Sequence, residues 1–299
     1  MSLRDAPIGC VPIVWNNAEL LDLAPETPAG IVLDEMARLG YDGSQSGRGF
    51  PESGEELRGL FAARTLRFAE LYSAVQAGPE GLASDAGEVA HRDLSRLVAA
   101  GGEVLVVAVD GGGERDAWSG RVAEGAPQWK AAAFEGLAQL LGELVAAAPD
   151  GVRIAFHPHA STWVESPDEV EALASRLPDT GAGLCLDVGH YLVGGGAPVR
   201  AIRRYGSLVR HVHLKDVDPG VLARLRSREI VGFSAAVRER IFTELGNGAL
   251  DLHGVLATLD AVEYGGWLMV EQDSSWLRPA EAAAVGGRVL RYALRELDR

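Results

Sequence analysis

The sequence predicts an α/β protein of the (β/α)8 TIM-barrel class, folded as one domain over residues 1–299. Eight short β-like runs alternate with eight longer amphipathic patterns, which predicts parallel strands joined by right-handed helical crossovers. Eight such units in this length are typical of a closed barrel. A doubly wound open sheet is the alternative, but it usually carries a glycine-rich phosphate turn after its first strand, and residues 11–17 have none.

The elements follow one another in the order that a barrel needs. The short runs are apolar and the longer segments are amphipathic, which distinguishes strands from helices. The expected strands are residues 8–15, 41–46, 66–75, 103–110, 152–157, 183–187, 208–214 and 267–271. The expected helices are residues 29–39, 55–63, 87–99, 128–147, 167–177, 198–205, 250–262 and 279–297. Residues 217–248, between the seventh and eighth strands, are too long for a simple loop. The helical composition of residues 222–240 predicts a partly helical insertion over the barrel mouth.

The charge balance excludes some partners. With 28 Lys and Arg against 42 Asp and Glu, the formal net charge is −14, which argues against nucleic acid and anionic membranes as partners. No stretch approaches 18 apolar residues without a charge, so no membrane span is expected. Cys10 and Cys185 lie far apart in apolar runs and the N-terminus lacks a secretory signal, so a cytoplasmic location is expected.

Each of the last four expected strands ends at a residue that can bind a metal. These residues are His157, Asp187, His213 and Glu271. Barrel active sites form at the carboxyl ends of the strands, so the four side chains are expected to converge. Two imidazoles and two carboxylates suit a divalent ion, with Mn²⁺ or Co²⁺ preferred and Zn²⁺, Mg²⁺ or Fe²⁺ as alternatives. Four isolated polar strand ends are the other interpretation, but four in succession favour a shared site.

Alternation of side chains along a strand predicts which residues face the barrel axis. The expected inward residues are Cys185, Asp187, His211, His213, Lys215, Met269 and Glu271. His211 lies deeper on its strand than His213, which favours a hydrogen-bonded core histidine over a metal ligand.

Several short motifs stand at the strand ends. The first strand is followed by Trp15-Asn16-Asn17, the fifth by His157-Pro158-His159 with Thr162 and Glu165, and the sixth by Asp187-Val188-Gly189-His190. The seventh strand carries His211-Val212-His213-Leu214-Lys215-Asp216. Around the eighth strand lie Leu245-Gly246-Asn247-Gly248, Gly266-Trp267 and Val270-Glu271. Through them the chain resembles the xylose isomerase-like TIM-barrel superfamily of sugar isomerases and epimerases, and within it the inosose (2-keto-myo-inositol) dehydratases.

The resemblance implies a metal held by a Glu, an Asp, a His and a Glu on strands five to eight. Asp187, His213 and Glu271 match the last three, and His157 replaces the first Glu. Ketose epimerases need two carboxylates on opposite faces of the substrate, so this replacement favours one-sided proton abstraction followed by elimination. Gln45 is a second departure, since the dehydratases carry an acid near that position.

The resemblance therefore implies a metal-dependent dehydratase that acts on a cyclic keto-polyol. The acid/base candidates are His159, His190, Lys215 and Glu271, without a ranking. Lys215 has a structural alternative, which is pairing with Asp216 or Asp187. Trp15 is expected to form an apolar wall or simply to pack at the mouth, and Asn16, Asn17 and Gln45 to hydrogen-bond substrate hydroxyls.

Three other functions are open. A metal-dependent isomerase or epimerase on another polyol would be favoured by a second carboxylate entering the site, such as Glu165 or Glu244. A non-catalytic polyol-binding barrel would bind ligand without turnover. An endonuclease IV-like enzyme needs a basic groove, which the net charge of −14 opposes. The expected partner is a small polyol or sugar, with a homo-oligomer possible.

Overall fold

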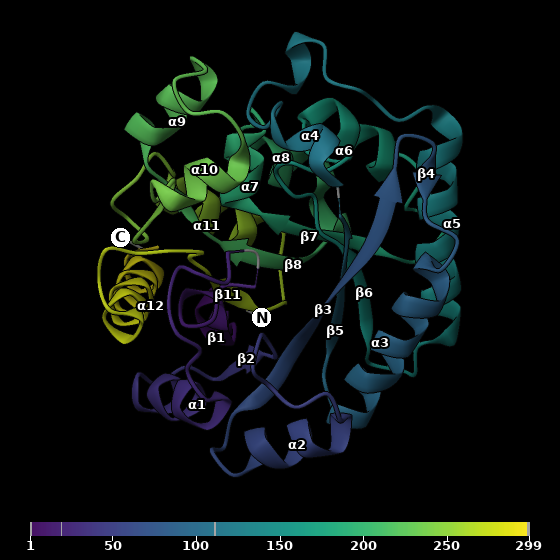
Figure 1. Ribbon diagram of the computed structural model, residues 1–299. Helices are drawn as coiled ribbons and strands as arrows, with labels where there is room; N and C mark the ends of the chain where they lie inside the picture. Colours follow the sequence, from purple (N-terminus) through teal and green to yellow (C-terminus); the bar gives the residue numbers. More distant parts are fainter. Residues whose placement is uncertain (1, 19, 111, 298–299) are drawn as a thin grey trace.

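The computed structural model describes residues 2–18, 20–110 and 112–297, and it is a closed barrel of parallel strands surrounded by helices (Figure 1). The eight barrel strands are β1 (Ile8–Cys10), β2 (Gly43–Gln45), β3 (Arg67–Gly78), β5 (Val104–Asp110), β6 (Arg153–Phe156), β7 (Gly183–Asp187), β8 (Val209–Leu214) and β11 (Leu268–Val270). Their order is β2-β1-β11-β8-β7-β6-β5-β3, and β2 also pairs with β3, which closes the ring. The predicted fold class is confirmed.

Two of the strand predictions need correction at their ends. The first strand was expected over residues 8–15 but ends at Cys10, because Pro12 opens the 3-10 turn η2 (Pro12–Val14) and cannot donate to a strand ladder. The strand expected over residues 66–75 extends to Gly78. There it turns back into β4 (Gly81–Leu82), which pairs with it in antiparallel fashion.

The eight expected helices are present. They are α1 (Ala29–Arg38), α2 (Gly54–Ala62), α3 (Ala86–Ala100), α5 (Ala131–Ala147), α6 (Pro167–Ala174), α8 (Pro198–Tyr205), α11 (Leu252–Ala261) and α12 (Pro279–Glu296). Two short helices that the sequence did not predict follow strands directly, namely α4 (Gly112–Asp116) and α7 (Val188–Val193). Three further 3-10 turns are η1 (Leu3–Asp5), η3 (Val122–Glu124) and η4 (Gly206–Leu208). Within the described residues, none of the helices combines the length and the apolar character that crossing a bilayer requires.

The barrel strands separate an outer core from the interior. Leu184, Leu186, Val212, Leu214, Leu268 and Val270 pack in the large cluster between strands and helices. Cys185 and Met269, from alternate positions, belong to two smaller clusters inside the barrel. The predicted inward face of the last strands is therefore confirmed, and it carries polar residues toward the mouth.

The insertion after β8 is folded, but not as one helix. It comprises β9 (Asp216–Val217), α9 (Pro219–Arg226), α10 (Phe233–Arg238) and β10 (Phe242–Thr243), with β10 antiparallel to β9. The expected partly helical insertion is confirmed, and its helical residues are divided between α9 and α10, since Arg228 and Gly232 have positive φ angles of 66° and 91° and interrupt the helix. The two helices form a lobe at the upper left of Figure 1 and have an apolar cluster of their own.

Asp216 fastens this insertion to the barrel. Its buried carboxylate accepts backbone N–H groups from Val217, Gly246, Gly248 and Leu250, at 2.8 to 3.0 Å. Four hydrogen bonds to one carboxylate leave it no capacity to pair with Lys215, so the Asp216 pairing considered above is wrong. The carboxylate instead holds the return segment of the insertion against the end of β8.

We expect Asp216→Ala to lower the free energy of unfolding by about 3 kcal/mol or more, because four backbone donors lose a charged acceptor. Asp218→Ala is the matched control. Asp218 caps α9 through Gly220 and Val221 at a more exposed position, so its loss should cost about 1 kcal/mol. Urea titration of both variants measures the difference. Equal losses would show that the Asp216 contacts add nothing beyond an ordinary cap.

Candidate functional site

The carboxyl ends of β6, β7, β8 and β11 bring four polar side chains into one cluster. Donor atoms of His157, Asp187, His213 and Glu271 all lie within 4.8 Å of one another. Nδ1 of His213 is 2.6 Å from Oε2 of Glu271 and 3.9 Å from Oδ2 of Asp187, which is 3.7 Å from Nε2 of His157. The convergence predicted from the strand ends is present, and we call these four residues the donor cluster. Their role as metal ligands stays a prediction.

Each member of the donor cluster has a buried polar atom without a hydrogen-bond partner in the described part of the chain. These atoms are Nδ1 of His157, Oδ2 of Asp187, Nδ1 of His213 and Oε2 of Glu271. The last two are close enough to form an ion pair but are not oriented as a hydrogen bond. Because buried polar atoms normally find partners, the three of them that lie together, on Asp187, His213 and Glu271, indicate a binding position. The donor set, two imidazoles and two carboxylates, fits a divalent metal ion.

Glu70, in the middle of β3, supports the cluster from the opposite side of the barrel, and the sequence analysis missed it. Its Oε2 accepts hydrogen bonds from Nε2 of His213, at 2.9 Å, and from Nε2 of His211. Burial alone would raise the pKa of Glu70, but the two imidazoles, His213 first, lower it to about 2. Because Nε2 of His213 is bound to this carboxylate, Nδ1 is the nitrogen that faces Asp187 and Glu271 and that would hold an ion.

A signal for Glu70 was present in the sequence. It is the one charged residue between Phe68 and Val75, inside an otherwise apolar strand. A buried charge requires a partner, and this one has two. His211 is fully buried and hydrogen-bonded, so its expected role as a core histidine is confirmed. Although Glu70, His211 and His213 could also be grouped as metal donors, Oε2 of Glu70 and Nε2 of both histidines are already hydrogen-bonded to one another.

Lys215 extends from the end of β8 into the same space. Its Nζ lies 2.7 Å from Asp273, 2.9 Å from Glu271 and 3.5 Å from Asp187, and Nε2 of His190 is 2.9 Å away. Burial alone would lower the pKa of Lys215, but the carboxylates of Asp273, Glu271 and Asp187 raise it well above its ordinary value. The expected contact with Asp187 is present, and Asp273 is a partner that the sequence analysis missed.

The rings of His159 and His190 pack together beside Lys215, with centroids 3.7 Å apart and planes tilted by 35°. Nδ1 of His159 lies 2.7 Å from the carbonyl of Ala160, while the N–H of Ala160 donates to Nδ1 of His190. Ala160 therefore contacts both rings, and Nε2 of His190 is left facing Nζ of Lys215. Burial, followed by the charges of His157 and Lys215, lowers the pKa of His159 to about 3, so its ring is neutral at physiological pH.

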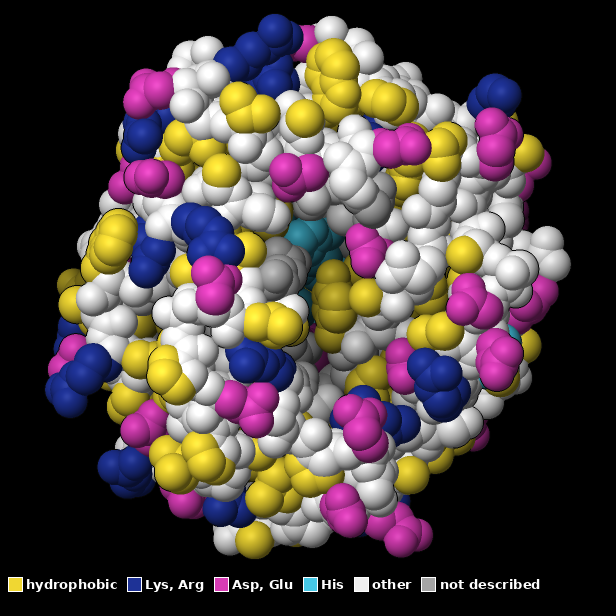
Figure 2. All heavy atoms as spheres, in the orientation of Figure 1, with side chains coloured by type: hydrophobic (Ala, Val, Ile, Leu, Met, Phe, Trp, Pro, Cys, Tyr) yellow, Lys and Arg dark blue, Asp and Glu magenta, His cyan; other side chains and the backbone are white. Residues whose placement is uncertain are grey.

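Aromatic residues of the insertion cover this pair. Phe233 packs edge-on against His159, and Phe242 lies against His190 and 4.5 Å below Nζ of Lys215. On the barrel side, Tyr72 lies edge-on to His157, with ring centroids 5.6 Å apart. The molecular surface is hollowed at this face, and histidine side chains form the floor of the hollow (Figure 2). The insertion therefore shields the donor cluster without closing it.

The predicted substrate-binding residues are used differently. Trp15 packs in the outer core and its indole N–H donates to Glu35 of α1. The amide of Asn16 bonds to the backbone of Thr27 and Arg48, and that of Asn17 to the backbone of Leu20 and Asp273. Gln45 is buried at the end of β2, and its Oε1 has no hydrogen-bond partner in the described residues. Substrate contact by these four residues stays a prediction, and the geometry favours Gln45 most.

The two carboxylates that could have favoured an epimerase bind elsewhere. Glu165 is buried and accepts the backbone N–H groups of Gly120 and Ser161. Glu244 pairs with Gln272 and Ser275. Neither belongs to the donor cluster. Within the described residues, the structure therefore supplies no symmetric pair of free carboxylates from these loops.

Known proteins share both the sequence and the fold of this chain. The family described as "xylose isomerase-like TIM barrel" matches residues 33–293. The inosose dehydratase of Clostridium beijerinckii is 30% identical over 287 residues, which cover 95% of each chain.

Solved structures share the architecture at lower identity. The IolI protein, solved with a bound zinc atom, has a TM-score of 0.70 at 15% identity, covering 97% of this chain and 99% of its own. An L-ribulose 3-epimerase has a TM-score of 0.70 at 16% identity, covering 98% and 96%. Together with the family match over most of the chain, these findings show that the protein belongs to the xylose isomerase-like TIM barrel family of enzymes.

Proposed function

We propose that the protein is a divalent-metal-dependent dehydratase of a cyclic keto-polyol such as 2-keto-myo-inositol. The donor cluster beside the buried Lys215 carries this proposal, because it combines a metal-binding donor set with a proton carrier. The inosose dehydratase relative supports the substrate class. The replacement of the expected strand-five glutamate by His157 supports elimination over epimerisation, since it removes one of two opposed carboxylates.

The residues that would hold the metal are His157, Asp187, His213 and Glu271. A divalent cation bound there would supply Lewis-acid stabilisation of negative charge that develops on the substrate carbonyl oxygen. The zinc in the IolI neighbour supports a divalent ion, and the mixed nitrogen and oxygen donors favour Mn²⁺ or Co²⁺. Glu70 orients His213 for this task by holding its Nε2–H.

Two residues of the chain, Glu271 and Lys215, then carry out one proton transfer each. Burial opposes ionisation of Glu271, but Lys215 and then His213 hold its pKa well below its usual range, so it is a carboxylate that can accept the proton next to the carbonyl. Lys215, kept as an ammonium ion by Asp273, Glu271 and Asp187, donates a proton to the departing β-hydroxyl. The C–H and C–O bonds break, a conjugated C=C bond forms, and water leaves.

The paired histidines and the insertion organise this step. Nζ of Lys215 donates to Glu271 and Asp273 and lies 2.9 Å from Nε2 of His190, which fixes its position. Phe233 and Phe242 exclude water from one side of the ammonium group, which strengthens its contacts with Asp273 and Glu271. Gln45 would bind a substrate hydroxyl, which its Oε1 supports because this atom has no hydrogen-bond partner in the described residues.

We expect Asp187→Ala to bind Mn²⁺ or Co²⁺ at least about 10-fold more weakly than the wild type, because a buried carboxylate of the donor cluster is lost. The combined Asp187→Ala, His213→Ala variant should retain negligible metal. Metal content after dialysis and equilibrium titration measure both. Asp218→Ala is the control for loss of an acid outside the site. Equal and negligible metal in wild type and variants would remove the metal from the proposal.

Incubation with 2-keto-myo-inositol and Mn²⁺ or Co²⁺ tests the reaction. We expect a conjugated dione that absorbs in the ultraviolet, because elimination joins a new double bond to the carbonyl. Chelation of the metal should abolish the signal, and readdition should restore it. An epimeric ketose without the ultraviolet band would instead identify a metal-dependent epimerase. Binding without turnover that chelation leaves unchanged would identify a polyol-binding barrel.

Glu70→Gln tests the positioning role of Glu70. The neutral amide of glutamine cannot accept hydrogen bonds from both imidazoles as the carboxylate of glutamate does, so metal affinity should fall by about 10- to 100-fold. Excess metal should restore most of kcat, which a merely unfolded variant would not show. Glu165→Gln, another buried acid with partners outside the donor cluster, should keep wild-type metal affinity. Unchanged affinity in Glu70→Gln would exclude the positioning role.

A further inference from the structure

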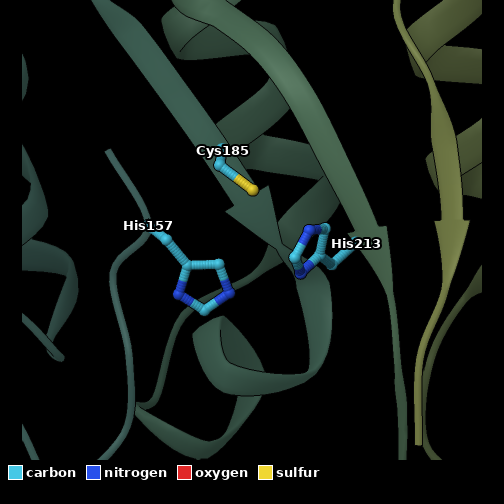
Figure 3. A group of neighbouring side chains, drawn as sticks. All are labelled: His157, Cys185 and His213. Atoms are coloured by element: carbon cyan, nitrogen blue, oxygen red, sulfur yellow. The ribbon is translucent and has the colours of Figure 1, made fainter. Parts of the chain in front are cut away.

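Cys185 lies directly below the donor cluster. It is on β7, two residues before Asp187, so its side chain points to the same interior face one step deeper in the barrel. Figure 3 shows its sulfur directed into the space between the rings of His157 and His213. One nitrogen of each ring and Sγ of Cys185 all lie within 4.8 Å of one another. All three residues are buried, with exposed fractions of 2% for His157, 0% for Cys185 and 1% for His213.

Two sets of donors therefore share the same pair of imidazoles. The donor cluster adds the oxygens of Asp187 and Glu271 to them, and the deeper set adds the sulfur of Cys185. We infer that His157, Cys185 and His213 form a second metal position, selective for soft ions such as Cd²⁺ and for Zn²⁺, which excludes the ion of the donor cluster when it is filled. The shared rings cause the exclusion, and two divalent ions so close together would also repel each other.

The chemistry of the donors separates the ions. Thiolate sulfur selects soft and borderline metals, whereas carboxylate oxygen suits harder ions such as Mn²⁺. Around a tetrahedral Zn²⁺ with bonds of about 2.0–2.3 Å, donor atoms lie about 3.3–3.8 Å apart. The spacing of the three residues is within about 1 Å of this requirement. Small rotations of the side chains would therefore close the set around an ion.

Proton balance adds to the selectivity. At neutral pH an ordinary cysteine thiol carries its proton, and so does Cys185 in the protein without metal. Binding of a divalent ion forms a metal–sulfur bond and breaks the S–H bond, and the proton leaves to solvent. Only an ion with high affinity for sulfur compensates for this loss. Mn²⁺ does not, and so it stays with the oxygen donors.

The consequence is inhibition by soft metals. An ion held at Cys185 removes both imidazoles from the donor cluster, so it blocks the activity proposed above. The binding itself does not depend on that activity, and only the inhibition rests on the proposed function.

Titration of the metal-free protein with Cd²⁺ tests the binding. A thiolate-to-Cd²⁺ charge-transfer band in the ultraviolet should saturate at one ion per chain in the wild type and disappear in Cys185→Ser and Cys185→Ala. Cys10→Ser is the matched control, because Cys10 is also buried with a pKa raised to about 12 but packs in the outer core. It should keep the band. No band in the wild type, or a band that survives in both folded Cys185 variants, would overturn the inference.

Asp187→Asn separates the two positions. This variant should bind Mn²⁺ at least about 10-fold more weakly than the wild type but keep the Cd²⁺ band, whereas loss of both would show that the deeper set is not a position of its own. With Mn²⁺ present, Cys185→Ser should need about tenfold more Cd²⁺ or Zn²⁺ than the wild type for half-inhibition, each measured against its own uninhibited rate. Equal sensitivity of the wild type and Cys185→Ser to Cd²⁺ or Zn²⁺ would overturn the inferred inhibition. If the protein has no dehydratase activity, the spectroscopic result still decides the binding.

Discussion

A carboxylate on β3 and two imidazoles on β8 meet across the interior of the barrel, and the rest of the site depends on this contact. Counted around the ring, β3 and β8 are separated by three strands on either side, so Glu70 reaches His211 and His213 only because the barrel is closed. Alternation along β8 places both histidines and Lys215 on one face. His211, the deepest of the three, is bound to Glu70. His213 joins Glu70 to the donor cluster, and Lys215 reaches the mouth of the barrel.

The charges in this interior are not balanced by the protein alone. Three buried or nearly buried carboxylates, those of Asp187, Glu271 and Asp273, lie around the ammonium group of Lys215, and a fourth, that of Glu70, faces His211 and His213. Buried charges are costly unless they are paired. Imidazolium formation at His213 offsets part of the excess, because burial lowers its pKa but Cys185, Glu70 and Glu271 together raise it well above the ordinary value. A divalent cation offsets the excess more fully, which is why the donor cluster and the proposed metal support each other.

The insertion covers one side of the site. Asp216 holds the returning segment to β8, while Phe233 and Phe242 bring the apolar cluster of the insertion against His159, His190 and Lys215. Residues from other loops fasten the same lobe, since Asp116 caps α10 and Asp22 pairs with Arg238. The lobe therefore acts as a fixed roof over one side of the hollow, where low polarity strengthens the contacts of the buried ammonium group.

The sequence by itself determined the barrel and the convergence of His157, Asp187, His213 and Glu271. Both follow from local geometry, because alternation assigns each side chain to a face and parallel strands end at a common edge. Only the tertiary structure decided the partners. Glu70 and His211 are 141 residues apart, Trp15 faces α1 because β1 ends before Pro12, and the insertion is divided by two residues with positive φ. Which strand lies opposite another is set by closure of the ring, and no local pattern encodes it.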